Sequence, residues 1–545
     1  MRATFFGLEI GRSGLTVSQI GLDVTGHNVA NVDTEGYTRQ RIINTAYEPF
    51  SALRQLRPVD QALVGAGAHV IALDQIRSAY LDRIYRNEAT LSGYYDTRVT
   101  GLSYVESLFE GAEQAELSTN LMNLFSAFNT LAANTDDLPQ RTIVRETAQA
   151  LTEDLKGMYE RLLNQQQAQN DSVAIITEQI NVMAQSLSEL NKSIYAYEMN
   201  GQKANDLRDK RNLLLDQLSE LTEITYEEGP DEKMTVWLGS DPTDPDQMLV
   251  SHYTVRTLEC GTASNPLAGE FDLYVPVWTD GNGAAWTDST GTAQTNAASI
   301  TGGELRSHID LCAVTTKDNA GIPYFVEQLN NLARALVQEI NTIHNAAFTH
   351  YNAAGGSHDG VDFFNTIDDA TGLPYTDLSE ISAKNIRLSD DILADPYNIA
   401  ASAKPVTQDP SDPNFVDPND TQQSNNEIAL KYYRLLDKPN IALTGGFGTV
   451  VTGSGTVVGS FFGYMDSIVT DVATTLDHTK RLNSTQTIQT LNAQNNRLSI
   501  SGVSIDEEMT NLIKYQHAYA GASRIITTMD EILDKLINST GRVGL

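Results

Sequence analysis

The residues that could carry acid–base, nucleophilic or metal chemistry are nine histidines, two cysteines and a few acidic loops. None of the histidines is followed by glutamate, so the HExxH pattern of zinc metalloproteases is missing. The sequence has neither a GxSxG nucleophile elbow nor a GxxxxGK[ST] phosphate loop. Cys260 and Cys312 cannot complete a structural zinc site alone, and two unrelated buried thiols are favoured over one disulfide.

Three loops carry residues that could hold a cation. NAAGGSHDGVDFF (352–364) combines glycine, histidine and aspartate, and the Asp-Pro loops DPTDPDQ (241–247) and QDPSDPNFVDPND (408–420) are rich in carboxylates. Neither Asp-Pro loop has the spacing of a calcium-binding EF-hand. We interpret both as solvated loops, because proline continues neither a helix nor a central strand. The first is interpreted as a polar loop before a buried Phe363–Phe364 pair. The sequence therefore predicts no enzyme, no cofactor and no metal site.

The composition excludes other classes of function. A chain of 545 residues is too long for one core, so several domains are expected. Its formal charge of −33 argues against nucleic-acid binding, which needs clusters of lysine and arginine. No apolar run is long enough to cross a bilayer, so we expect no membrane insertion. The start, MRATFFGLEIGRSGL, is a poor secretory signal, because charged and glycine residues interrupt its apolar run.

Hydrophobic periodicity places helices in both flanks of the chain and strands in its middle. Apolar residues from Val173 to Tyr197 recur at steps of three and four, which is a heptad seam typical of an ordinary helical core. Gly201 is expected to end this helix and a second, antiparallel one to follow it. Further helices are predicted near residues 322–348 and 460–498. Residues 226–300 alternate strand-like runs with turns and predict a β-rich insertion.

The two ends of the chain carry amphipathic helices with no partner nearby in the sequence. The C-terminal pattern predicts one helix of about 35 residues from Ile505, opened by acidic residues that suit the helix dipole. Isolated helices are marginal in water, so the two ends must pack on each other or on neighbouring copies. The expected packing stripe consists of Leu15, Leu22, Val29, Ile505, Met509, Leu512, Tyr519, Ile526 and Leu533. HNVANVDTEGYTRQ (27–40) ends the first helix, and we expect Asn28, Asn31, Gly36 and Tyr37 to shape the exit from it.

These terminal segments resemble those of a known family. HNVANVDTEGYTRQ is similar to the N-terminal signature of the flagellar axial proteins, typically written NNIAN-x-x-TPGY, with Glu35 in place of the usual proline. SGVSIDEEMTNLIKYQHAYAGASRIITTMDEILDKLI (501–537) resembles their C-terminal signature. The internal segments LRDKRNLLLDQLSELTEITYEE (207–228), GGELRSHIDL (302–311) and DDILADPYNIAAS (390–402) agree, so the resemblance spans most of the chain. Its length and the TRQ after Tyr37 are most similar to members at the junction between hook and filament.

The resemblance implies a multidomain, mainly α fold with β insertions. Residues 1–45 and 500–545 would form a coiled coil of paired terminal helices. Residues 46–225, 302–350 and 425–499 would form a helical-bundle rod domain. Residues 226–301 and 351–424 would form an outer β-rich domain.

The function implied is structural: helical self-assembly into the junction between hook and filament. The expected partners are copies of the chain, the hook protein, a second junction protein and a cytoplasmic export chaperone at the C-terminal helix. Export would use the flagellar type III route, without a cleaved signal peptide. The alternatives left open are another axial protein, such as a hook or second junction protein, a secreted adhesin or enzyme carried by the β-rich middle, and a cytoplasmic coiled-coil scaffold.

Overall fold

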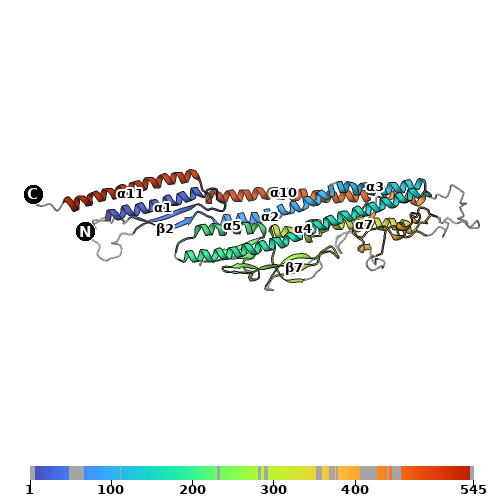
Figure 1. The fold of residues 1–545 in the computed structure, drawn as a ribbon, viewed down its shortest axis with the longest axis horizontal. Helices are drawn as coiled ribbons and strands as arrows, with labels where there is room; N and C mark the ends of the chain where they lie inside the picture. The colour runs from blue at the N-terminus through green and yellow to red at the C-terminus, as the bar shows by residue number, and fades with distance from the viewer. Residues whose placement is uncertain are drawn as a thin grey trace, which may run out of the picture.

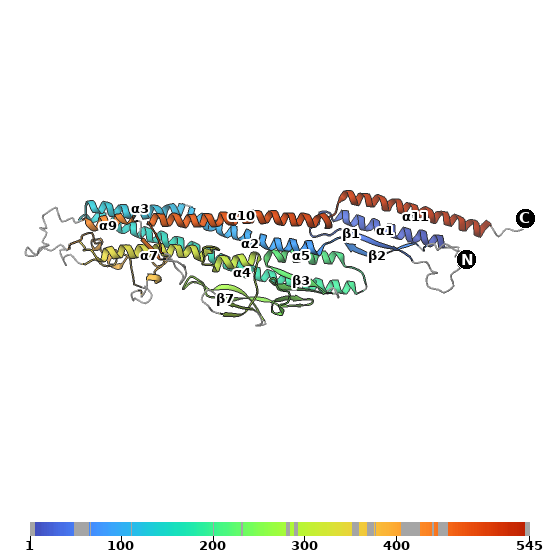
Figure 2. The same ribbon diagram turned by 180° about the vertical axis from the view of Figure 1, so that it is seen from behind.

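Long helices run side by side along most of the molecule, and both ends of the chain lie at the same tip (Figures 1 and 2). The computed structural model describes residues 6–47, 65, 67–110, 112–199, 201–229, 233–279, 284–287, 293–350, 359–367, 375, 378–404, 426–438, 441–444 and 456–539. The Asp-Pro loop at 408–420 lies outside these residues. The mainly α fold with β insertions is confirmed.

A helical rod forms the thicker part of the molecule. It contains α2 (Ala79–Glu110), α3 (Ala112–Ala133), α4 (Leu138–Glu198), α6 (Gly303–Ala313), α7 (Ile322–Asn345), α9 (Glu427–Leu435) and α10 (Phe461–Ser501). Leucine, phenylalanine and isoleucine side chains at helical spacing fill one core along these helices. Phe128 is fully buried in this core and stacks on Tyr432, with ring centroids 4.3 Å apart. The helices expected near 322–348 and 460–498 are thereby confirmed.

Helix α4 continues beyond this core and turns back at Gly201. Gly201 has a φ of +75°, which glycine adopts without steric cost.

 The next helix, α5 (Asn205–Leu221), runs antiparallel to α4, because Arg208 pairs with Glu198 and Arg211 bonds to Asn191. Most of the expected heptad seam on α4 is buried there, although Tyr197 at its end is 67% exposed. The antiparallel pair predicted from the sequence is confirmed.

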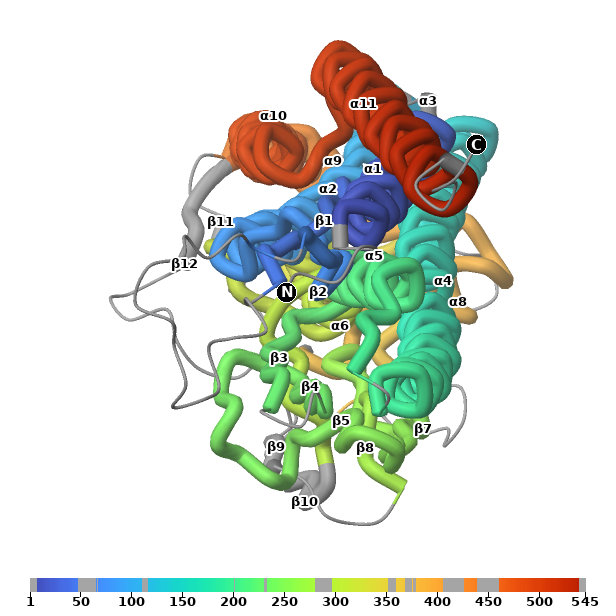
Figure 3. Tube along the Cα trace, turned by 90° about the vertical axis from the view of Figure 1, so that its left-hand side faces the viewer, coloured from blue at the N-terminus to red at the C-terminus, as the bar shows by residue number. Residues whose placement is uncertain are grey.

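Two small antiparallel sheets pack on α4 and α5, on the opposite side of the molecule from α10 and α11 (Figure 3). One contains β3 (Ile224–Glu228), β4 (Met234–Leu238), β5 (Met248–Ser251) and β6 (Thr254–Val255), in that order. The other has the order β7 (Leu258–Ala263), β8 (Leu273–Trp278), β10 (Ala293–Ala297) and β9 (Ala284–Thr287). Alternating apolar residues of both sheets, such as Val236 and Trp278, share a second core with α4 and α5. The strands expected in 226–300 are present.

The sequence analysis grouped residues 351–424 with these sheets, but the described part of this segment packs in the rod core. Phe363 and Phe364 are fully buried in the rod core, as the sequence indicated for this pair. The amide of Asn341 on α7 holds them, accepting hydrogen bonds from both backbone N–H groups and donating to the Phe364 carbonyl. The short helices η2 (Leu378–Glu380), α8 (Asp390–Ala394) and η3 (Pro396–Asn398) follow, and Ile381, Leu388 and Ile392 join the same core. Grouping this segment with the sheets was wrong, because its scattered apolar residues complete the rod.

A smaller hairpin joins β11 (Ile441–Thr444) to β12 (Thr456–Gly459) before α10. Both cysteines are free, and burial raises the pKa of the Cys312 thiol. Among the described helices, none combines the length and the apolar character needed to cross a bilayer. The described residues also contain no group of three or more histidine, cysteine or acidic side chains placed to hold a metal ion.

The thin tip of the molecule is formed by α1 (Phe6–Ala30), α11 (Ile505–Ser539) and a two-stranded ribbon. The ribbon pairs β1 (Gln40–Ala46) with β2 (Ala68–Gln75) and packs on α1. The sequence analysis assigned residues 46–225 to the helical rod. The structure instead places Ala68–Gln75 in a strand of the tip. Two strands alone are marginal in water, and this ribbon is supported by its packing on α1.

Candidate functional site: the terminal helix pair and its polar joint

Helices α1 and α11 pack against each other in antiparallel directions, which confirms the paired terminal helices. The α1 residues on the α11 side are small or polar and recur at steps of four and three. They are Gly7, Gly11, Gly14, Ser18, Gly21, Thr25 and Asn28. We call these residues the small-residue seam. The spacing is that of a heptad, but small residues occupy the positions that leucine or isoleucine usually fills.

Glycine in this seam sets how closely the helices approach. A Cβ atom on Gly11 would lie 2.7 Å from Cγ1 of Ile526, and one on Gly21 would lie 2.7 Å from the Tyr515 ring. Side chains at a helix contact determine the distance between the axes, so larger residues here would push α11 away. In contrast, Gly26 on the same helix has nothing within 4 Å of a Cβ position.

The expected packing stripe lies partly in this contact and partly outside it. Leu15, Leu22 and Val29 are half-buried beside the small-residue seam of α1. On α11, Leu512, Ile526 and Leu533 are half-buried, whereas Ile505, Met509 and Tyr519 are 50%, 41% and 40% exposed. The helix contact also uses Glu508, Tyr515, Ala522 and Met529, which the sequence analysis missed. The regular recurrence of glycine in α1 was the signal that could have identified them.

Both C-terminal helices leave large apolar side chains exposed. On α11 these are Ile505, Met509, Ile513, Tyr519, Ile525, Ile532, Leu536 and Ile537, and on the second half of α10 they are Leu482, Ile488, Leu491, Leu498 and Ile500. We call these thirteen residues the exposed apolar set. Isolated exposed leucines are normal on a protein surface, but repeated ones on neighbouring helices mark an interaction surface.

The second half of α10 has its polar side inward. Its buried positions after Leu476 are Thr479, Gln486, Ala493 and Ser501. Gln486 donates to the Glu88 carboxylate and carbonyl on α2, and Thr490 donates to the same carbonyl at 3.1 Å. An ordinary surface helix directs its apolar side chains to the core and its polar ones to solvent. This half of α10 does the opposite, with amides and hydroxyls inside and isoleucine and leucine outside.

A polar joint connects the helix pair to the rod, and Asn28 is its centre. The Asn28 side chain is 1% exposed. Its Nδ2 donates to the Gln40 carbonyl at 2.9 Å and to Glu508 Oε2 at 3.2 Å. Its Oδ1 accepts from the Tyr37 hydroxyl at 2.8 Å and from the Gln40 N–H at 3.0 Å. Every donor and acceptor of this amide is therefore used, as a buried amide requires.

Arg39 ties the same joint to the end of α10 and the start of α11. Its Nε lies 2.7 Å from Glu508 Oε1, and its Nη1 lies 2.5 Å from Glu507 Oε2. Its backbone N–H donates to the Ser501 carbonyl at 2.9 Å. Glu508 is 2% exposed, so its charge is compensated by Arg39 and Asn28 rather than by water. The acidic first turn of α11 thus serves this contact as well as the helix dipole.

Asp209 on α5 anchors the joint to the rod. Its carboxylate accepts from the Thr38 N–H at 3.0 Å and from Gln75 Nε2 at 2.8 Å. Burial raises the pKa of Asp209 to about 6, although the hydrogen bonds from Thr38 oppose the shift. Burial also raises the pKa of the Tyr37 hydroxyl, and the carboxylates of Asp206, Asp209 and Glu508 add to this effect.

The turn between α1 and β1 accounts for the other expected residues. The Asn31 amide donates to the His27 carbonyl at the end of α1, and Thr34 donates to Asn31. Gly36 has a φ of +76°, which favours glycine, and a Cβ there would lie 3.1 Å from Cβ of Leu213 on α5. The structure thus brings Asn28, Gly36 and Tyr37 together at the joint, while Asn31 stays in the exposed helix end.

Comparison with family models gives three matches along the chain. Residues 102–364 match the flagellar hook-associated protein FlgK helical domain. Residues 8–38 match the flagella basal body rod protein family, and residues 494–539 match the flagellar basal body rod FlgEFG protein C-terminal family. The match at 8–38 covers most of α1 and its turn, and the match at 494–539 covers the end of α10 and all of α11. Helices α1 and α11 are the two that pair at the tip.

Relatives match over nearly the whole chain. The flagellar hook-associated protein 1 of Bacillus subtilis is 28% identical, and the alignment covers 100% of both chains. The flagellar hook-associated protein 1 of Escherichia coli is 24% identical over 96% of this chain and 98% of its own. The solved structure of the flagellar hook junction protein FlgK from Burkholderia pseudomallei superposes with a TM-score of 0.55 at 15% identity, covering 77% of this chain and 100% of that one.

Proposed function

Because the chain belongs to the flagellar hook-associated protein 1 family, whose members are structural proteins of the hook–filament junction, we propose that it assembles at that junction. Copies of the chain would contact one another there through α10 and α11. The membership also makes it an exported component of the flagellum that assembles with other axial proteins. The neighbours proposed are further copies of the chain, the hook protein on one side and a second junction protein on the other.

The observation that carries the self-assembly proposal is the exposed apolar set. Covering an isoleucine or leucine side chain contributes roughly 1.5–3 kcal/mol, and this favours a chain partner over water. Copies related by a screw operation make the same contact repeatedly, which suits a ring or helical layer. The reversed polarity of α10 supports the same proposal, because that helix gains a second apolar contact without losing its polar contact to α2.

The proposed structural units of assembly are the terminal pair, the rod with residues 359–367 and 378–404, and the two sheets on α4 and α5. The expected stripe residues that remain exposed, Ile505, Met509 and Tyr519, are assigned to contacts between copies. Leu512, Ile526 and Leu533 are assigned to the α1–α11 contact itself. Asn28, Gly36 and Tyr37 would fix the angle between the tip and the rod, and Asn31 would finish α1.

Before assembly the exposed apolar side chains of α11 need a partner that shields them from water. We propose that a cytoplasmic export chaperone binds them. Chaperone affinity is expected to fall when residues 505–537 are removed. Unchanged affinity of the truncated chain would show that the chaperone binds elsewhere.

Electron microscopy of detached flagella tests the position of the protein. A gold label on the variant Met122→Cys uses a side chain that is 52% exposed on α3. The parent chain with its two natural cysteines measures background labelling. A short band between hook and filament is the expected result. Label along the hook or the filament would instead favour another axial role, and its absence from flagella would favour an adhesin or a cytoplasmic scaffold.

A further inference from the structure

The ribbon of β1 and β2 has an outer face that carries exposed apolar side chains. Gln40 is buried against α1, and successive residues of a strand point to opposite faces. Ile43 and, just beyond β1, Tyr47 therefore lie on the face turned away from Gln40. Ile43 is 37% exposed and Tyr47 is 46% exposed. The Tyr47 ring stacks on that of His69 in β2, with ring centroids 4.2 Å apart.

Ile71 adds another apolar side chain at a β-bulge of this ribbon. Ile43 pairs with Ala72 and Asn44 pairs with Val70, so Ile71 is the extra residue of β2. Its side chain is 59% exposed. Bulges commonly re-aim a side chain and are features of the fold rather than defects. We call the three exposed residues the ribbon surface: Ile43, Tyr47 and Ile71.

The ribbon lies on the opposite side of α1 from α11 (Figures 1 and 3). The tip thus has three layers, with α1 in the middle and exposed apolar side chains on both outer layers. Copies related by a screw operation make heterologous contacts, in which one surface meets a different surface of the next copy. The exposed apolar residues of α11 therefore need a second surface on the neighbour, and the ribbon surface lies on the far side of the same tip.

We infer that the ribbon surface of one copy receives α11 of the neighbouring copy, through Met509 and Ile513. This inference rests on the proposed self-assembly. The two side chains are 41% and 53% exposed, and they share a face because they are four residues apart. Tyr515 packs on Gly21 of α1, and a residue two positions earlier lies on nearly the opposite side of a helix. Ile513 therefore points away from α1 and is open to a neighbour.

The ribbon and the first half of α11 lie at the same level along the tip. At one end, Asn28 of α1 donates to the Gln40 carbonyl of β1 and to Glu508 of α11. At the other end, Ser13 of α1 accepts from the Ala68 N–H of β2. The ribbon thus runs beside the same stretch of α1 that packs on the first half of α11. A neighbour at the same height would present this half of α11 to the ribbon.

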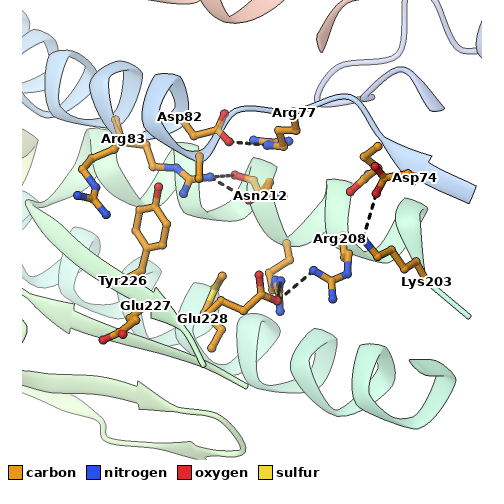
Figure 4. Close-up of a pocket in the computed structure, with 15 residues that line it drawn as sticks. Asp74, Arg77, Asp82, Arg83, Lys203, Arg208, Asn212, Tyr226, Glu227 and Glu228 are labelled. Atoms are coloured by element: carbon orange, nitrogen blue, oxygen red, sulfur yellow. Dashed lines mark hydrogen bonds and ion pairs between the residues drawn. The ribbon is translucent and has the colours of Figure 1, made fainter. Parts of the chain in front are cut away.

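Charge complementarity at the base of the tip favours the same occupant. Arg41 lies on the outer face of the ribbon, and its side chain is 60% exposed. Its Nη2 is 3.6 Å from Asp74, which pairs more closely with Lys203, at 3.0 Å (Figure 4). Asp506 is exposed in the first turn of α11, and it shares a face with Ile513 because the two are seven residues apart. The guanidinium of one copy would meet this carboxylate of the next.

Crosslinking in detached hook–filament junctions tests the inference. The variant Ile43→Cys with Ile513→Cys is treated with a short bismaleimide. It is expected to give a ladder of bands at multiples of the chain mass of 59.6 kDa, because each copy would react with two different neighbours. Each single variant is expected to stay at the mass of one chain, because a heterologous contact does not bring like residues together.

The controls separate this contact from others. Met122→Cys with Ile513→Cys places the first cysteine on an exposed position of the rod and is expected to give no ladder. The parent chain measures the reaction of its two natural cysteines. A dimer formed by Ile513→Cys alone would overturn the inference, because α11 would then meet α11. A double variant of Ile43 and Ile513 that is present in junctions but gives no ladder would also overturn it.

A charge swap tests the contact without cysteines. Arg41→Glu and Asp506→Arg are each expected to lower the amount of chain in junctions about fivefold, because like charges would then face each other. The two substitutions together are expected to restore it, and Lys431→Glu on α9 is the matched control that should assemble normally. Thermal unfolding of each purified chain shows that the variants are folded. A double variant no better than the single ones would overturn the inference. Absence of the parent chain from flagella would instead contradict the proposed function.

Discussion

The rod core and the C-terminal half of α10 with α11 are both helical, yet they place their apolar residues on opposite sides. In the rod, side chains such as Phe125, Phe128 and Leu155 are completely buried by other helices of the same chain. In α10 beyond Leu476 and in α11, thirteen large apolar side chains are exposed. The buried residues of α10 there are polar or small, and α11 packs on the small-residue seam of α1. The difference teaches that the rod buries its apolar residues within a single chain, whereas the proposed assembly with neighbours would bury those of α10 and α11.

The largest expected effect is a difference in how much a substitution in each region lowers the free energy of unfolding. Phe128→Ala should lower the free energy of unfolding by about 3–5 kcal/mol, because it leaves a cavity between Tyr432 and Phe363. Ile488→Ala, at a side chain that is 60% exposed, should change it by no more than about 0.5 kcal/mol. Urea unfolding of both purified variants measures the contrast. A comparable loss in both would mean that α10 is already covered in the single chain.

The next effect concerns the small-residue seam. Gly21→Ala should weaken the α1–α11 contact by about 1–3 kcal/mol, because its Cβ would overlap the Tyr515 ring. Gly26→Ala is the matched control, and it should stabilise α1 slightly, since alanine is the better helix former and the space is open. Hydrogen exchange of the backbone N–H groups in residues 6–30 measures the effect of both substitutions. Equal protection in the two variants would contradict the close helix contact.

A smaller effect is expected at the polar joint. Asn28→Ala should cost about 1–2 kcal/mol of local stability, because the buried Glu508 and the Gln40 backbone lose their partner. Asn31→Ala, in the exposed helix end, should cost less. Hydrogen exchange of the Gln40 N–H measures the joint directly. If both variants exchange alike, Asn28 does not organise the joint.

The smallest effect is the pH dependence of the joint. The pKa of Asp209 is about 6 in the folded chain and about 4 in an unfolded one. Between these values the folded state binds the extra proton, so stability should rise as the pH falls from 7 to 5, by on the order of 1 kcal/mol. Asp209→Asn should remove this contribution. A steeper loss of joint stability toward pH 5 in the parent chain than in Asp209→Asn would contradict the sign.

The helices could be predicted from the sequence because their apolar residues follow helical spacing over long stretches. The heptad seam of α4 and the start of α11 at Ile505 are examples. The contact residues of the tip could not be identified in the same way. Hydrophobic periodicity counts leucine and isoleucine, but α1 meets α11 through Gly11 and Gly21, so contact residues of α11 such as Tyr515 were missed.

The candidate site was predicted in part for a related reason. Asn28, Gly36 and Tyr37 stand in one short motif, whereas their partners Asp209 and Glu508 are far away in the sequence. Local spacing gives no information on such long-range hydrogen bonds. The sequence analysis grouped 351–424 with the β-rich part for a similar reason. Its few apolar residues show no periodicity, and only the structure shows that the described ones pack in the rod core.

Hydrogen–deuterium exchange on the free chain and on detached hook–filament junctions tests the central claim most directly. The account predicts that residues 479–539 gain protection on assembly, concentrated on helix segments that carry the exposed apolar set, while residues 121–162 in the rod core are equally protected in both states. Unchanged exchange in 479–539, with the chain present in the junction, would contradict the claim that neighbouring copies complete the tip.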